Sequence, residues 1–102
     1  MRKSINTPTE NIYANNINAF DIEANNIEAC DIKAGNVDAY DITALNIDAN
    51  NITALNITAL DIDANNIDAL TITIKDGCKI TCKSLKCSNR EELINAGKVI
   101  FK

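Results

Sequence analysis

Four cysteines, Cys30, Cys78, Cys82 and Cys87, are the residues of this chain best suited to metal binding or redox chemistry. Three and four residues separate the last three, and the first lies far away, whereas a strong zinc signal has paired Cys-x-x-Cys units. The chain has no histidine, which excludes a site with imidazole ligands and a His-based catalytic triad. Because free cysteine also behaves as a small buried hydrophobe, we expect reduced, structural cysteines, no metal and no cofactor. A metal site and a regulatory or intermolecular disulfide are the alternatives that the spacing disfavours.

Charge is the second feature with chemical consequences, and it is unevenly distributed. Residues 11–75 carry ten acids against two lysines, whereas residues 76–102 carry six bases against three acids. Phosphate contacts need Lys and Arg, so the acidic part of the chain is not expected to bind nucleic acid directly. No nucleophile and base pair, glycine-rich phosphate loop or cluster of metal carboxylates is recognisable. We therefore expect a protein that is not an enzyme.

A five-residue repeat accounts for the acidic part of the chain. From Asn11 to Lys75 the unit Asn/Asp-Ile-x-Ala-x recurs thirteen times; Val37 replaces Ile once, and the last unit has Thr71 in the Asn/Asp slot and Ile74 in the Ala slot. Within a unit, Ile-x-Ala alternates like a very short strand, with Ile and Ala on one face and x on the other. The Asn or Asp is expected at a turn, bonded to nearby backbone or in a left-handed conformation. Short strands and bends that repeat in this way predict an all-β fold, a single-stranded β-helix with Ile inside.

The outward slot between Ile and Ala is where the repeat places side chains that a partner would meet. It is acidic in six units, and these residues are the candidate interaction surface: Glu23, Glu28, Asp38, Asp48, Asp63 and Asp68. A solvated face that keeps the protein soluble is the simpler interpretation, and an acidic surface that imitates DNA is the sharper one. In the slot after Ala, Leu45, Leu55, Leu60 and Leu70 are either buried or form an exposed apolar strip that marks an interface.

Residues 11–75 resemble the pentapeptide-repeat proteins, a family of right-handed, four-sided β-helices whose unit reads Ala-Asp/Asn-Leu-x-x. The resemblance lies in the period, in the Asn or Asp before a large aliphatic residue, and in the pairing of that residue with Ala. The phase differs, because here Ala follows the aliphatic residue by two positions, as in Ile17-Asn18-Ala19. Some members of the family bind DNA gyrase by imitating DNA, so the resemblance implies an acidic inhibitor of a nucleic-acid enzyme.

Two coil sizes remain open from the sequence, three-sided and four-sided. Thr43, Thr58 and Thr73 recur every fifteen residues, as three units per coil would require. Phe20, Tyr40 and Leu60 would instead stack in a four-sided coil of twenty residues. A recent fifteen-residue duplication inside a four-sided coil would also explain the threonines.

The C-terminal segment, residues 76–102, is expected to finish the coil and cap it. After a turn at Asp76-Gly77-Cys78 the repeat resumes, shifted by three residues, with Cys82 and Cys87 in the Ala slot. Ser88–Glu91 is typical of a capping box, Glu92–Ala96 of a short helix that Gly97 ends, and 98–102 of an apolar strand. The strand residues Val99, Ile100 and Phe101 are the candidate self-association site, because solenoid ends leave unpaired backbone groups. Residues 1–10 are expected to form an N-terminal arm or thin cap.

These patterns predict a non-catalytic solenoid that offers a rigid surface to another protein and forms a homodimer. The alternative is a self-assembling structural component, such as a phage or cell-surface piece, that stacks through its ends. No apolar segment follows the charges of residues 1–7 and no run of eighteen apolar residues is present. We therefore expect a cytoplasmic protein without membrane contact.

Overall fold

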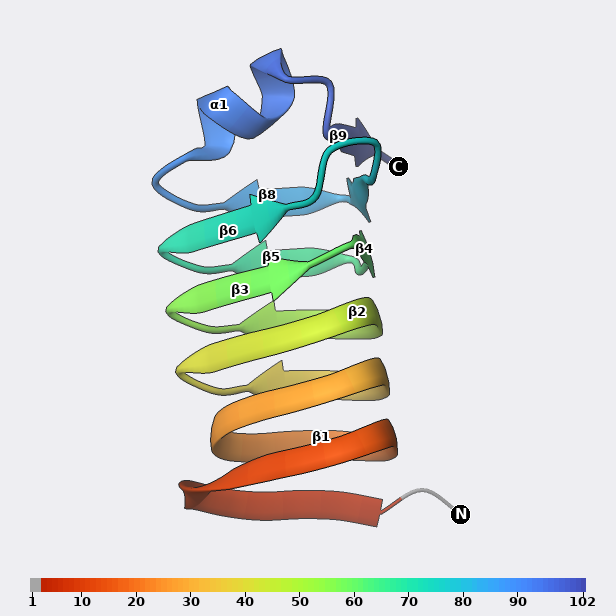
Figure 1. Cartoon of the computed structure of the whole chain (residues 1–102), viewed down its shortest axis with the longest axis vertical. Helices are drawn as coiled ribbons and strands as arrows, with labels where there is room; N and C mark the ends of the chain where they lie inside the picture. The colour runs from red at the N-terminus through yellow and green to blue at the C-terminus, as the bar shows by residue number, and fades with distance from the viewer. Residues whose placement is uncertain (1–2) are drawn as a thin grey trace.

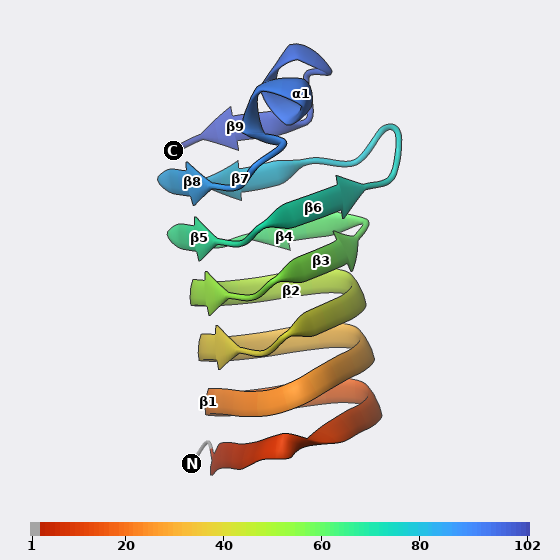
Figure 2. The same ribbon diagram turned by 90° about the vertical axis from the view of Figure 1, so that its left-hand side faces the viewer.

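The repeat units are short strands that wind into a parallel β-solenoid of about five turns (Figure 1). This computed structural model describes the backbone of residues 3–102 and the side chains of residues 11–102. The coils stack along the longest dimension of the molecule, which measures 37 × 24 × 20 Å. The first strands run through several bends of the coil, and the later ones are shorter (Figure 2). The elements are β1 (Lys3–Asp38), β2 (Asp41–Thr53), β3 (Asn56–Ala59), β4 (Asp61–Asp63), β5 (Asn66–Asp68), β6 (Thr71–Ile74), β7 (Ile80–Cys82), β8 (Ser84–Lys86), α1 (Arg90–Asn95) and β9 (Val99–Phe101).

Strand pairing fixes the coil at fifteen residues. Ile27 pairs with Ile42, Ile42 with Ile57 and Ile57 with Ile72, each in parallel register. Three five-residue units therefore complete one turn, and the solenoid has three sides. The four-sided alternative is wrong for this chain, because a twenty-residue register would pair Ile27 with Ile47 instead.

Each side of the solenoid is a column of stacked strands, which we name by its later members. Face A contains β3 and β6, face B contains β4, β7 and β9, and face C contains β5 and β8. All three columns continue into β2, which pairs with β3, β4 and β5 and, on its other edge, with β1.

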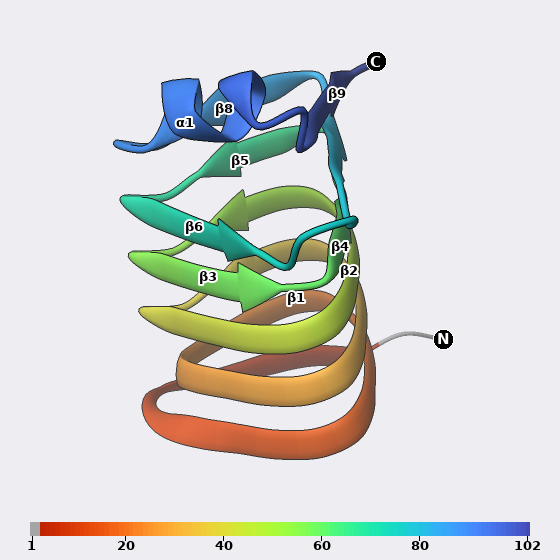
Figure 3. The ribbon, with the colours of Figure 1, turned by 45° about the horizontal axis from the view of Figure 1, so that its top comes forward.

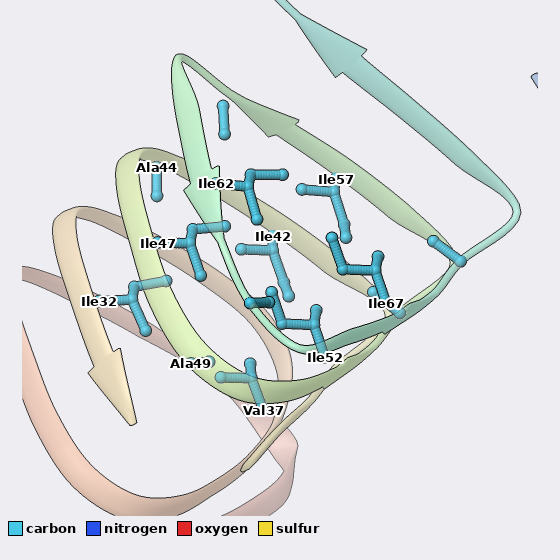
Figure 4. Packing of buried hydrophobic residues seen from close by; sticks show 14 of the residues in the cluster. Ile32, Val37, Ile42, Ala44, Ile47, Ala49, Ile52, Ile57, Ile62 and Ile67 are labelled. Atoms are coloured by element: carbon cyan, nitrogen blue, oxygen red, sulfur yellow. The ribbon is translucent and has the colours of Figure 1, made fainter. Parts of the chain in front are cut away.

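The core is an aliphatic column at the centre of the coils, into which the Ile side chains point from all three faces (Figure 4). Every Ile-slot residue from Ile17 to Ile72 is buried, and Ile12 is half-buried. Ala-slot residues are buried from Ala34 to Ala69, whereas Ala14 is exposed. Full burial of an Ile side chain contributes about 1.5–3 kcal/mol relative to exposure, so this column is the main stabilising element. The predicted division into inward and outward slots is confirmed.

Asn and Asp residues that precede Ile form hydrogen-bonded rows along the outside of the coils. Asn36 Nδ2 donates to Asp21 Oδ1 at 2.7 Å, Asn51 Nδ2 to Asn36 Oδ1 at 2.7 Å, and Asn66 Nδ2 to Asn51 Oδ1 at 2.8 Å. No described residue other than glycine has a positive φ. The expected bonds to nearby backbone and left-handed conformations are therefore wrong for these residues. Stacking at about 4.8 Å brings equal slots of successive coils within reach of each other, and the side chains bond along the axis instead.

The predicted turn after β6 is present and adds three residues to one coil. Gly77 has a φ of 86°, which favours glycine. Beyond the turn the register lengthens to eighteen residues, so that Ile62 pairs with Ile80 and Ile67 with Leu85. The repeat continues in the same columns, and Cys82 is buried in the Ala slot as predicted.

The helix α1 and the strand β9 lie over the C-terminal end of the coils (Figure 3). The predicted capping box is wrong: Asn89 precedes the helix, and no side chain caps its first turn. Asn89 bonds the backbone of Ile72 instead, and the Ser88 hydroxyl donates to the Leu70 carbonyl. Both polar side chains therefore pair with the last coil rather than with the helix. Leu93 is the buried residue of α1 and packs on the core.

Candidate protein-interaction surface

The six acidic residues predicted as an interaction surface are divided among the three faces. Glu28 lies on face A, where it pairs in register with Thr43 and not with another acid. Asp48 and Asp63 are neighbours on face B. Face C carries the remaining three. The sequence identified these side chains as outward-facing, but it did not separate the faces.

The acids of face B are partly neutralised within the chain. Lys33 is in register with Asp48, and Lys102 Nζ lies 2.7 Å from Asp63 Oδ1. Lys102 Nζ also lies 3.4 Å from Asn65 Oδ1. The basic C-terminal segment thus contacts the acidic coils of its own chain.

Face C has the larger group of outward acids. Glu23 and Asp38 line one shallow depression together with Tyr40. Asp38 is in register with Thr53, and Thr53 with Asp68. Lys86 follows Asp68 in the next coil, so the acidic row ends there.

A row of exposed apolar side chains lies at the corner between face C and face A. Tyr40, Leu55 and Leu70, which we call the corner row, are 57%, 42% and 58% exposed. They stack in three successive coils, because Leu55 N–H donates to the Tyr40 carbonyl at 2.8 Å and Leu70 N–H to the Leu55 carbonyl at 2.9 Å. The exposed strip predicted as one alternative for Leu55 and Leu70 is therefore present. Leu45 and Leu60 stack at a different corner.

The grouping of Tyr40 with two of the leucines is the part that sequence reasoning missed. The signal that would have found it is the fifteen-residue spacing, because Tyr40, Leu55 and Leu70 differ by fifteen. Threonines confirm the same period: Thr43 pairs with Thr58 and Thr58 with Thr73 on face A.

The cysteines occupy different parts of the fold and are free thiols. Cys82 is buried, Cys78 and Cys87 are half-buried, and Cys30 is exposed. Burial raises the pKa of the Cys82 thiol, and the Lys102 and Arg90 charges lower it by less. Burial also raises the pKa of the Cys87 thiol above its usual value. Within the described residues, no group of three His, Cys, Asp or Glu side chains is placed to hold a metal ion.

The candidate self-association residues form β9, which pairs with β7 of the same chain. Val99 is in register with Ile80, and Phe101 with Cys82. Val99 is half-buried against the core, whereas Ile100 and Phe101 are 48% and 44% exposed. The Arg90 guanidinium carbon lies 5.4 Å from the centre of the Phe101 ring, within the range of a cation–π contact.

The chain matches no known protein family, no curated protein and no solved structure. Its fold is a parallel β-solenoid built from five-residue units. None of the helices among the described residues is long and apolar enough to cross a membrane.

Proposed function

We propose that this protein is a non-catalytic, rigid module that binds another protein through the corner row and the acidic residues beside it. The observation that carries the proposal is the exposure of Tyr40, Leu55 and Leu70 in successive coils. Exposed apolar side chains that form one contiguous strip mark protein-interaction sites, and tyrosine is enriched among the residues that contribute most to interface affinity.

The fold itself does not require apolar residues in these positions. The same slot, after Ala, holds Asn50 and Asn65 at the corner between faces B and C. There the Asn65 amide nitrogen lies 3.4 Å from Asn50 Oδ1 and continues the polar rows of the solenoid. Leu55 and Leu70 cannot form such a hydrogen bond and leave apolar surface exposed to solvent, and this favours a role in binding.

An enzyme that acts on nucleic acid is one class of partner that fits this surface. The resemblance to pentapeptide-repeat proteins supports it, since some of those proteins imitate DNA. Glu23, Asp38 and Asp68 on face C would then occupy sites that receive phosphates. The fifteen-residue coil differs from the four-sided coil of that family, so the charge of face C is the main support for the DNA-mimic form. We place this function in the cytoplasm, because four free thiols suit a reducing compartment.

Capture from a host lysate with matched variants tests the proposal. A Leu55→Ser/Leu70→Ser double variant removes most of the corner row, and Leu45→Ser at another corner is the control. Both sets are exposed, so both variants should melt like the wild type. We expect a protein that the wild type and the control retain and the double variant loses. Equal retention by all three would show that the corner row is not the interface.

Self-assembly is the second candidate, and β9 is the observation that favours it. β9 follows β7 at the C-terminal end of face B, and its Ile100 and Phe101 side chains are half exposed. Sedimentation at micromolar concentration should show a homodimer, and Ile100→Lys should shift it to monomer while β9 stays paired with β7. A monomeric wild type would refute this candidate.

A further inference from the structure

We propose that the partner segment bound by the corner row is a basic amphipathic α-helix that lies along the solenoid axis. This inference rests on the function proposed above and names the chemistry of its partner. Its grounds are the spacing of the row, the charges beside it and the rigidity of the coils.

The spacing of the row fits a helix better than a strand. Parallel coils are about 4.8 Å apart, so the row from Tyr40 to Leu70 spans about 9.6 Å. Positions i, i+4 and i+7 of an α-helix lie on one face and span about 10.5 Å along its axis. Positions i, i+2 and i+4 of an extended strand span about 13 Å. The axial spacing of residues on one face of a helix therefore matches the spacing of the three side chains in the row. The spacing along one face of a strand does not.

The charges beside the row favour a basic partner. Asp38 and Asp68 precede it on face C, and Asp41 follows Tyr40 on face A. Within the described part of the chain none of these three carboxylates makes an ion pair. Residues 36–43, 51–58 and 66–73, the stretches of coil that carry the row, contain no Lys or Arg. The nearest cation on face C is Lys86, which follows Asp68 in the next coil, so the acidic margin extends from Asp38 to Asp68. An apolar stripe with Lys or Arg along both margins matches this pattern of charge.

The coil presents the row in a fixed geometry. The backbone hydrogen bonds of Leu55 to Tyr40 and of Leu70 to Leu55 set the interval between the side chains. A ridge of side chains at a regular interval packs into the grooves between the side-chain rows of a helix. Since the backbone of the solenoid needs no ordering, the cost of ordering a backbone on binding falls on the partner helix alone.

Binding of a synthetic peptide tests the inference with a defined probe. The peptide contains only Leu and Lys, is about five turns long, and has Leu at i, i+4, i+7 and i+11. Fluorescence anisotropy at about 0.15 M salt should show saturable one-to-one binding, and circular dichroism should show helix formed on binding. Leu55→Ser should reduce the affinity about tenfold, because it removes apolar area that the helix would bury. Leu45→Ser, at another corner, should leave it unchanged. Asp38→Asn/Asp68→Asn should weaken binding more at low salt than at high salt.

Three results would overturn the inference. The first is no binding of the helical peptide. The second is equal binding of a peptide with the same composition but with Leu distributed round all sides, because the acids alone would then explain the attraction. The third is tighter binding of an alternating Leu-Lys peptide, which favours a strand. If the lysate protein is lost with Leu55→Ser/Leu70→Ser while the helical peptide fails to bind, the helix is excluded and the protein-binding function stands.

Discussion

The side-chain amide of Asn89 takes the place of a peptide group above Ile72. Its Oδ1 accepts from Ile72 N–H at 3.2 Å, and its Nδ2 donates to the Ile72 carbonyl at 2.7 Å. The neighbouring Ile74 carbonyl accepts from Lys98 Nζ at 2.8 Å. Side chains thus pair the outer edge of β6, which would otherwise template another strand.

Replacing Asn89 should destabilise the end of the coil. Asn89→Ala leaves the N–H and C=O of Ile72 without their partners in a half-buried position, at a cost of about 1–3 kcal/mol. Asn95→Ala, in the exposed part of α1, is the matched control and should change stability by less than about 0.5 kcal/mol. Urea unfolding measures both, and equal effects would show that the Ile72 contacts contribute no stability.

The inward and outward slots should differ sharply in their tolerance. Ile47 stacks between Ile32 and Ile62 in the core, whereas its neighbour Asp48 faces solvent. Ile47→Asn should cost about 1–3 kcal/mol for the buried amide in addition to lost packing. Asp48→Asn should change the free energy of unfolding by less than about 0.5 kcal/mol. Similar melting temperatures for the two variants would contradict the assignment of the slots.

Gly35→Ala should destabilise the protein, although alanine lowers the conformational entropy of the unfolded chain and would by itself be stabilising. A Cβ at Gly35 would lie 2.8 Å from the Phe20 carbonyl oxygen, so the backbone must shift. Crowding of this kind costs about 1–3 kcal/mol, more than the gain of about 0.4–1 kcal/mol from reduced unfolded-state entropy. Asn50→Ala, in the same slot one coil later, is the control: it loses only the long hydrogen bond from Asn65 and adds no crowding, so it should cost less than Gly35→Ala. A Gly35→Ala variant more stable than the wild type in thermal unfolding would exclude the crowding.

The buried thiol of Cys82 should make stability fall at alkaline pH. Its pKa is raised by burial in the folded chain, so above about pH 8.5 the unfolded chain loses this proton first and is favoured. The stabilising contribution is complete below the unfolded pKa and is lost as pH rises toward the folded pKa. Cys82→Ala restores the residue of most units and should fold, with a smaller loss of stability between pH 8 and 10. If the free energy of unfolding of the wild type and of Cys82→Ala changed identically with pH, the Cys82 thiol would not be the cause.

Thiol labelling should rank the cysteines by exposure. Cys30 is exposed and should react first with a thiol reagent, whereas Cys82 should react only when the chain unfolds. Mass spectrometry of labelled peptides over time gives the order. Rapid labelling of Cys82 in native protein would mean that β9 opens readily from β7.

The sequence was most informative where one residue type repeats in one slot. The Ile and Ala slots predicted the core almost residue by residue, because alternation about the backbone assigns each side chain to one side. It was less informative about groupings that depend on the number of sides, and so Tyr40 was not placed with Leu55 and Leu70. The capping box failed because a local pattern cannot reveal that Asn89 is needed at Ile72, seventeen residues earlier.

The fifteen-residue register also constrains how the gene can change in length. Asn46 separates Asp31 from Asp61 on face B, so these carboxylates never stack directly. Loss of the five codons for residues 51–55 would bring Asp61 over Asp41 and rotate every later residue by one face. Loss or gain of fifteen codons would shorten or lengthen the rod by one coil and leave every column intact. Viable length variants of this gene should therefore differ by multiples of forty-five nucleotides, except where an insertion is looped out, as the three residues at the turn after β6 are.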